Sequence, residues 1–281
     1  MRRILQSITN TIGFHSAALL GLLVVVAVVM QLRSPFFLTP ANLEVLMLGF
    51  ILEGIMAVGM TLVIIGGGID LSVSSVLPLA AVVSALLMRA GVPVMPAVVI
   101  TLLLAVTIGL INATLKTILD VHPFIATLAM MLTIRGVALV LSGGENISGM
   151  PESFAVLGQG DVLGVPIPIA IFVGLAVVFG LLLHHHRFFQ QIFFVGYDPR
   201  AARVSGINVT LVNYVIFGLC SGLAGLAGVI AASQYGAAHN SFGVMAELKV
   251  ITAVVIGGSN IVRGGSGNMF GTVLGVLFMA I

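Results

Sequence analysis

The sequence predicts an all-α, polytopic transmembrane helical bundle with Gly-rich broken helices. Of its 281 residues, 59% are hydrophobic and only 7% are charged, whereas soluble domains usually carry about 25% charged residues. Apolar runs such as 16–30 are long and do not alternate, which excludes the strands of about 10 alternating residues that build outer-membrane barrels. Because a spanning helix needs roughly 20 mainly apolar residues, we expect about 8–10 spans. They form a single transmembrane domain over residues 1–281.

The expected spans follow one another along the chain with short connections. The first apolar run has no small-residue cleavage site before Arg33, so we interpret it as an uncleaved span and not as a signal peptide. The last run contains about a dozen apolar residues, fewer than the roughly 20 that cross a bilayer, so we expect a chain truncated at its C-terminus. The expected ranges are 15–32, 43–65, 71–89, 94–115, 123–142, 165–183, 209–233 and 245–257, followed by the run that opens near Phe270.

Basic residues predict that the N-terminus is cytoplasmic. In that orientation most basic residues of the connections lie inside, as the positive-inside rule requires. The connection 143–164 then lies outside, and its charges are all acidic. The net charge of +2 reflects the cytoplasmic connections, so we expect no nucleic-acid partner. The basic residues expected inside are Arg2, Arg3, Lys116, Arg187, Arg200, Arg203 and Arg263, and those expected outside are Arg33 and Arg89.

The segment 184–208 is the longest one that is not built for lipid. It contains three arginines and one acid, which is typical of a cytoplasmic connection. The histidines at 184–186 point around a helix end and do not converge on a metal ion, and no nucleophile and base can be assembled from the isolated histidines. No phosphate-binding G-x-x-x-x-G-K-[ST] loop occurs. We therefore expect no catalytic residue, metal or cofactor in this chain.

Two Gly-rich interruptions, 63–75 and 254–267, each follow an apolar helix and precede another apolar run. Glycine permits backbone conformations and close approaches that other residues do not, and irregular backbone at membrane depth must be buried in protein or line water. The pair suggests a diverged repeat, and each member predicts a pathway wall or a tight re-entrant turn. The candidate residues are Gly66, Gly67, Gly68, Asp70, Ser72, Gly257, Gly258 and Asn260.

Three ionisable residues fall at or inside expected spans. Asp70 directly precedes an apolar helix, so its favoured role is to cap that helix, with an acid facing substrate or a proton as the alternative. Glu53 and Arg135 are intramembrane charges that pair with each other across two helices in one interpretation. In the other interpretation, Arg135 binds backbone carbonyls and Glu53 lies near the membrane–water interface. A structural role is favoured over a transport role for both.

Small residues recur at four-residue spacing in 221–233, as in Ser221 with Gly225 and Ala224 with Gly228. This spacing is typical of close helix packing in lipid. The sequence leaves open whether the partner helix belongs to this chain or to a second copy. The single cysteine, Cys220, lies in the same apolar run and is interpreted as a packed hydrophobe.

Four blocks, 55–81, 123–144, 196–209 and 247–277, together resemble the permease subunits of bacterial ABC importers for ribose, xylose, galactose and related sugars. The resemblance runs from about residue 40 to the end. It differs from the family at 187–191, which reads RFFQQ where relatives often have F-G-R, and at Ser74, where relatives commonly have glycine.

The resemblance implies a multi-pass protein of the bacterial inner membrane that is embedded in the lipid bilayer and carries no nucleotide site. The implied partners are a cytoplasmic ABC ATPase subunit, a periplasmic sugar-binding protein and a second permease copy, in a homodimer or a paralogous heterodimer. It also implies a cytoplasmic helix that docks in a cleft of the ATPase. The residues of this coupling segment are Gly196, Arg200, Ala201, Ala202, Arg203, Ser205, Gly206 and Ile207.

The function that follows is translocation of a monosaccharide, ribose-like or related, by alternating access. Three alternatives remain at this point. One is a permease of the same superfamily for nucleosides or branched-chain amino acids. Another is a secondary transporter driven by an ion gradient, with Glu53, Asp70 and Arg135 as the coupling set. The third, an intramembrane enzyme, lacks a nucleophile with a base.

Overall fold

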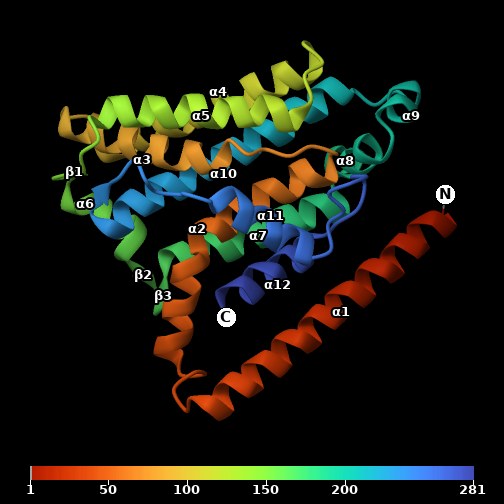
Figure 1. The fold of residues 1–281 in the computed structure, drawn as a ribbon, viewed down its shortest axis with the longest axis horizontal. Coiled ribbons are helices and arrows are strands. Elements are labelled where there is room, and N and C mark those ends of the chain that lie inside the picture. Colours follow the sequence, from red (N-terminus) through yellow and green to blue (C-terminus); the bar gives the residue numbers. More distant parts are fainter. Residues whose placement is uncertain (1) are drawn as a thin grey trace.

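The protein folds as an all-α membrane bundle, as predicted (Figure 1). The computed structural model describes residues 2–281, except for the side chains of residues 2–12 and 14. Within this part, six helices are long and apolar enough to cross a membrane. The helices are α1 (Arg2–Arg33), α2 (Pro40–Ile65), α3 (Val73–Arg89), α4 (Val94–Thr117), α5 (Pro123–Ser142), α6 (Glu152–Gln159), α7 (Ile167–His185), α8 (Arg187–Tyr197), α9 (Pro199–Val204), α10 (Val209–Tyr235), α11 (Ala246–Ile256) and α12 (Met269–Ala280).

Four short strands lie at one end of the bundle, beside α6 (Figure 1). β1 (Ile147–Ser148) pairs antiparallel with β4 (Ala237–Ala238), and β2 (Asp161–Val162) pairs antiparallel with β3 (Val165–Pro166). The hydroxyl of Ser233 accepts a hydrogen bond of 2.8 Å from the Gly158 amide, which ties α6 to the end of α10. We call this end the α6 end and the opposite one, which carries α8 and α9, the α9 end.

The centre of the bundle consists of α2 and α10. In their most apolar windows 72% and 78% of the residues are buried, compared with 17–33% in α1, α4, α5 and α7. α2 and α10 are therefore surrounded by protein, whereas α1, α4, α5 and α7 turn one face outward. α1 lies apart along one side of the bundle (Figure 1), and its Leu19 and Leu23 contact Leu274 in α12.

Small residues allow α10 to approach its neighbours closely. A Cβ atom on Gly228 would overlap the carbonyl of Leu77 in α3, and one on Gly109 of α4 would overlap the carbonyl of Phe217. The stripe with four-residue spacing therefore packs within this chain, against α3 and α4. Cys220 is completely buried against Gly59, as expected for a packed hydrophobe.

Among the described residues, six helices are long enough to cross a membrane, fewer than the 8–10 spans expected, and the expected spans 71–89 and 245–257 fall short. The range 245–257 forms a helix, α11, but this helix has only 11 residues, which is about 16 Å at 1.5 Å per residue and too short for a hydrocarbon core of about 30 Å. α11 follows Met245, whose φ is 62°, and ends at Gly257. α3, with 17 residues, and α12, with 12, are also shorter than a full span.

Gly109→Ala should lower the stability of the protein. The new methyl group collides with the Phe217 carbonyl, and overpacking of this kind costs about 2 kcal/mol. Gly136→Ala is the matched control, because no atom lies within 4 Å of a Cβ there and alanine favours the helix. Thermal unfolding in detergent is measured, and the reaction of the buried Cys220 with a thiol-reactive fluorophore reports the unfolding. Equal midpoints for the two variants would contradict the packing described.

Candidate functional site

The polar connection between α7 and α10 folds into α8 and α9 at the α9 end of the bundle (Figure 1). His184 and His185 form the last turn of α7, and His186 links it to α8. The three histidines therefore mark a helix end, as predicted. Among the described residues, no group of three His, Cys, Asp or Glu side chains is placed to hold a metal ion.

α9 is a six-residue helix that is fixed at its first turn. The Asp198 carboxylate accepts hydrogen bonds from the backbone amides of Arg200 at 2.8 Å and Ala201 at 3.1 Å. Pro199 occupies the first turn, where its missing N–H has no intrahelical partner to lose. Sequence analysis did not assign Asp198 this role, although an aspartate before proline is a typical helix start.

Most of the predicted coupling residues are exposed to solvent. Val204 is 91% exposed, whereas Ala202 is 4% exposed and attaches the helix to the bundle. The single salt bridge found among the described residues lies elsewhere, so the two arginines of α9 have no carboxylate partner there. A short helix with free guanidinium groups and small side chains suits insertion into a protein cleft lined by acidic or carbonyl groups. The exposed residues are Arg200, Ala201, Arg203, Ser205 and Gly206, Ile207 is half-buried, and Gly196 is buried.

Gly196, at the end of α8, joins this segment to both Gly-rich interruptions. A Cβ atom on Gly196 would overlap the carbonyl oxygen of Ile65, the last residue of α2, and would lie 2.6 Å from the Gly265 nitrogen. The Gly265 amide donates a hydrogen bond of 2.8 Å to the same Ile65 oxygen. Gly264 lies against the backbone of both Gly196 and Gly67. We call Gly67, Gly196, Gly264 and Gly265 the glycine junction.

Glycine is required at the junction for two separate reasons. Gly67, Gly264 and Gly265 have φ values of 71°, 62° and 67°, in the left-handed region that other residues rarely adopt. Gly196 has an ordinary helical backbone but no room for a side chain. The junction therefore brings three chain segments into direct backbone contact, so that a displacement of α8 and α9 acts on the end of α2 and on the loop before α12.

The first interruption, 66–72, contains a completely buried Asp70. Its Oδ1 accepts hydrogen bonds from the Ser72 amide at 3.0 Å and from the Asn112 amide group at 3.3 Å, and the Ser221 hydroxyl lies 3.4 Å from Oδ2. The predicted cap is therefore wrong: Ser72 occupies the N-cap position of α3 and makes no side-chain capping bond. The non-helical backbone directs the Asp70 carboxylate towards α4 and α10, where it links the break to both helices and is closed off from solvent.

Of the polar residues of α4 and α10 near this break, Lys116 was considered from the sequence only for its side of the membrane, and Asn112 and Asn213 were not singled out. Lys116 donates a hydrogen bond of 2.8 Å to Asn213 and lies 5.3 Å from the centre of the Phe217 ring. Asn112 donates to both Ser72 and Asp70. Their spacing was a usable signal, because residues four apart, such as 112 and 116, share one face of a helix.

The second interruption, 257–268, is a tight turn between two short helices. The Asn260 side chain accepts hydrogen bonds from the amides of Val262 at 3.0 Å and Arg263 at 3.1 Å. Gly258 has a φ of 97°, and a Cβ on Gly257 would overlap the Gly271 carbonyl at the start of α12. These contacts make the segment a tight turn.

The intramembrane charges do not pair with each other, so the interpretation of a Glu53–Arg135 pair is wrong. Glu53 forms a salt bridge of 3.3 Å with Lys249 of α11. Arg135 donates to the backbone oxygen of Ser74 at 2.7 Å and to the Ser75 hydroxyl at 3.3 Å, as the carbonyl-binding alternative predicted. α11 packs against α2 on the side of Glu53, whereas α3 packs against α5 on the side of Arg135. Lys249 also lies inside an expected span, so it should have been counted among the intramembrane charges.

The starts of α3 and α11 lie close together part of the way through the bundle. Gly243, three residues before α11, is so near α3 that a Cβ there would lie 2.8 Å from the Ser74 carbonyl oxygen. Glu53 is in the middle of the 26-residue α2, and its salt bridge with Lys249 fixes the start of α11 at that depth. Two half-helices that begin at membrane depth are a recurrent arrangement at transporter binding sites.

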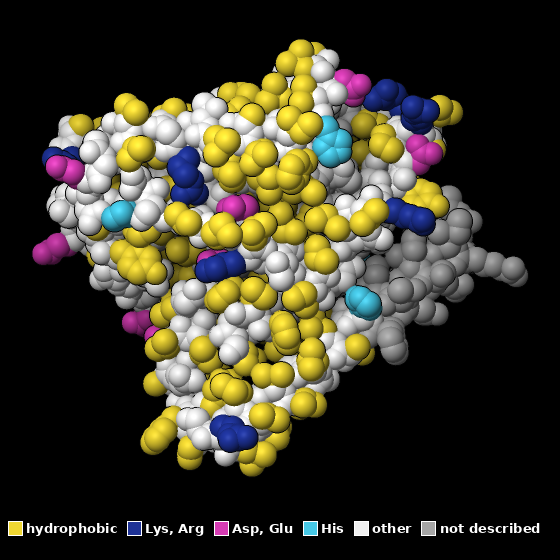
Figure 2. Space-filling model, in the orientation of Figure 1, with side chains coloured by type: hydrophobic (Ala, Val, Ile, Leu, Met, Phe, Trp, Pro, Cys, Tyr) yellow, Lys and Arg dark blue, Asp and Glu magenta, His cyan; other side chains and the backbone are white. Residues whose placement is uncertain are grey.

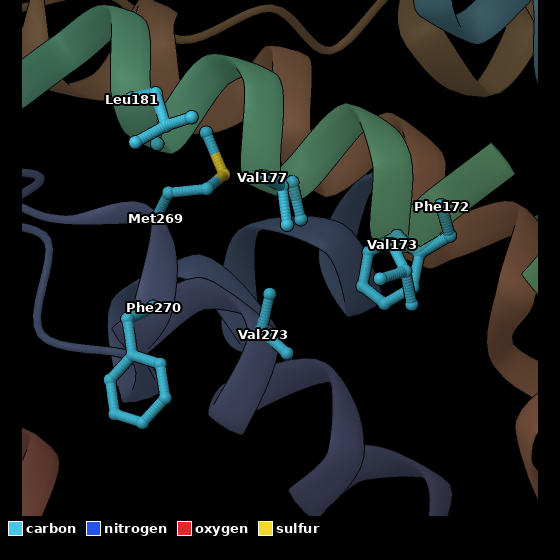
Figure 3. A pocket seen from close by; sticks show the side chains of 9 residues that line it. Phe172, Val173, Val177, Leu181, Met269, Phe270 and Val273 are labelled. Atoms are coloured by element: carbon cyan, nitrogen blue, oxygen red, sulfur yellow. The ribbon is translucent and has the colours of Figure 1, made fainter. Parts of the chain in front are cut away.

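Apolar grooves on the outside of the bundle offer no comparable chemistry. Figure 3 shows one of about 400 Å³ between α7 and α12, where Val177, Leu181 and Val273 point into the groove. A second, of about 580 Å³, lies between α4 and α10. Their lining residues are apolar and cannot bind a hydroxylated solute through hydrogen bonds, so both are suited to lipid chains.

Gly196→Ala should open the glycine junction. The methyl group displaces Ile65 and breaks its hydrogen bond with Gly265, at a cost of about 2 kcal/mol. We expect a lower unfolding midpoint and several-fold faster trypsin cleavage after Arg263, an exposed residue of the adjoining loop. Gly174→Ala on α7, where a Cβ meets nothing within 4 Å, is the control. Unchanged cleavage in the Gly196 variant would show that the junction does not hold the loop.

The family model and the relatives that match this chain are all described as permeases. A family model described as "Branched-chain amino acid transport system / permease component" matches residues 41–281. The ribose import permease protein RbsC of Escherichia coli (strain K12) is 39% identical over 266 residues, which cover 93% of this chain and 82% of the relative. The autoinducer 2 import system permease protein LsrD of Enterobacter sp. (strain 638) is 38% identical over 236 residues, which cover 82% and 72%.

No solved structure matches the chain significantly. The family model nevertheless covers most of the chain, and both relatives align with it over more than two thirds of their own length. The family model and the two relatives indicate the same class of protein. The chain therefore belongs to the family of branched-chain amino acid transport system permease components.

Proposed function

We propose that this protein is the permease subunit of an ATP-binding-cassette importer that translocates a monosaccharide, a ribose-like pentose or a related sugar, across the bacterial inner membrane. The names of the relatives support an import permease, since one is a ribose permease and another an autoinducer 2 permease. The chain itself carries no catalytic, cofactor or metal residue in this proposal, and ATP is hydrolysed by a separate cytoplasmic ATPase subunit.

The observation that carries the proposal is the construction of α9. Its two arginines and Val204 are exposed, and the arginines form no salt bridge within the part of the chain that the structure describes, while Asp198 and the buried Ala202 hold the helix in place. A helix with these features is suited to docking in a cleft of the ATPase. The α9 end would then be cytoplasmic, and the N-terminus would lie on the same side.

The glycine junction supports a route for the mechanical coupling. When the ATPase closes, α9 is pushed and Gly196 moves with it. Because the Gly196 backbone touches Ile65 and Gly265, the displacement reaches α2 and the loop before α12 without passing through flexible side chains. Rocking of the helices beside the two breaks would then open the pathway alternately to each side of the membrane.

A neutral, polyhydroxylated solute fits the charge distribution at membrane depth. Glu53 and Lys249 neutralise each other, and Arg135 is bound to neutral oxygen atoms. A periplasmic sugar-binding protein would deliver the solute, and a second permease copy would complete the pore. A ligand screen on the binding protein that pairs with this permease would identify the sugar, because such systems select their substrate largely at that step.

Arg203→Glu should weaken the complex with the ATPase by about tenfold, equivalent to about 1.4 kcal/mol. The substitution places an acid on the surface that is proposed to meet acidic or carbonyl groups of the partner. Arg89→Glu, at an exposed arginine of the α6 end, should leave binding unchanged. The measurements are co-purification of the permease with its ATPase and ATP-dependent sugar uptake by proteoliposomes. Normal binding and coupled hydrolysis in the Arg203 variant would refute the docking role, and uptake without any ATPase would indicate an ion-driven transporter.

A further inference from the structure

Large side chains with apolar surface are exposed on the connections at the α9 end, outside the spanning helices. Val262, in the turn 257–268, is 87% exposed, and Tyr197, at the end of α8, is 73% exposed. Val204 of α9, described above, is the third. Lipid covers such side chains on a spanning helix, but these three lie on polar connections between helices. Their exposure is typical of a surface that a protein partner covers.

Hydrogen bonds within the turn hold Val262 in its exposed position. The Asn260 side chain accepts from the amides of Val262 and Arg263. The Asn260 amide donates to the Ser266 carbonyl at 3.2 Å, and the Gly264 amide donates to the Asn260 carbonyl at 3.1 Å. A side chain whose backbone is fixed before binding loses little conformational entropy when a partner covers it. The turn therefore presents Val262 in a form that is ready to bind.

The turn and the coupling segment form one continuous surface. A Cβ atom on Gly265 would lie 2.8 Å from the Cβ atom of Tyr197, and Gly264 lies against the Gly196 backbone. Tyr197 directly precedes Asp198, the residue that caps α9. A protein that docks on α9 therefore meets the turn at the same time.

The charges of this surface are mainly basic. Arg200 and Arg203 of α9 and Arg263 of the turn are exposed, and the turn contains no acidic residue. Figure 2 shows Lys and Arg side chains with hydrophobic ones beside them on the right, where Figure 1 places α8 and α9. At the α6 end, by contrast, the charges of the connection 143–164 are all acidic. The α9 end is therefore complementary to a partner with an acidic surface around an apolar pocket.

We propose that the turn 257–268 is a second docking element for the cytoplasmic ATPase subunit, beside α9. This deepens the proposed function, on which it rests, by naming a further contact with the ATPase. Val262 inserts into an apolar pocket of the ATPase, and Arg263 meets acidic or carbonyl groups at the rim of that pocket. The same turn leads into α12, and its Gly265 binds Ile65 at the end of α2. The ATPase therefore contacts the second break directly and not only through α9.

Fluorescence quenching in nanodiscs tests this contact in the full chain. The only native cysteine, Cys220, is completely buried, so background labelling is low. A fluorophore attached to Val262→Cys should be quenched several-fold less by a water-soluble quencher once the ATPase subunit is added. Val204→Cys on α9 is the positive control. Val162→Cys, at an exposed valine of the α6 end, is the negative control and should show no protection.

Each outcome at position 262 has a distinct meaning. Protection at position 204 without protection at 262 would overturn the inference and leave the proposed function standing. No protection at either position would refute docking of the ATPase on this end altogether. Strong quenching at position 262 by brominated lipids, with or without the ATPase, would show that the turn faces lipid and would also overturn the inference.

Val262→Ser should lower the affinity of the permease for the ATPase by about tenfold, because a buried valine is replaced by a polar side chain in the complex. The unfolding midpoint of the free permease should not change, since Val262 is exposed there. Val162→Ser at the α6 end is the matched control and should bind normally. Titration of a fluorescent ATPase subunit against each purified permease gives the affinities. Equal affinities for the two variants would contradict the burial of Val262 by the ATPase.

Discussion

The direct contact of the Gly196 backbone with the Ile65 carbonyl and the Gly265 amide is the constraint on which the arrangement of the α9 end depends. It holds the end of α2, the polar α8–α9 segment and the turn between α11 and α12 at one point. Side chains are flexible and can absorb a displacement, whereas three interlocked backbones cannot. The end of α2 and the turn before α12 therefore share one point of contact with α8.

The first interruption precedes α3, and an irregular segment, 239–245, precedes α11, so that both helices begin at membrane depth. Their starts meet near Ser74 and Gly243, where Arg135 binds a free carbonyl. Asp70 satisfies another part of the break by accepting hydrogen bonds from Ser72 and Asn112. Because lipid offers no hydrogen-bond partners, every such group must find one in protein or water. This requirement explains why the polar residues of so apolar a chain gather along the broken helices.

Composition and the apolar runs were enough to predict the helical membrane class and most helix ranges. The expected range 123–142 coincides with α5, and the polar segment 184–208 was recognisable because its basic residues interrupt the apolar runs. The glycines that follow residue 256 also predicted where α11 ends. The sequence alone did not show that α11 is too short to cross the membrane. An apolar run does not indicate the depth in the membrane at which its helix begins.

Pairing between distant residues was beyond the sequence for a physical reason. A helix pattern tells which residues share a face, but it does not tell which helix will pack there. Glu53 thus pairs with Lys249 and not with Arg135, and Asp70 binds α4 and α10 instead of capping α3. The sequence by itself determined that the chain crosses lipid, where it leaves it and where its helices break. Only the tertiary structure decided that the two breaks and Gly196 meet, because that contact joins backbones about 70 to 200 residues apart, held by packing that no local pattern encodes.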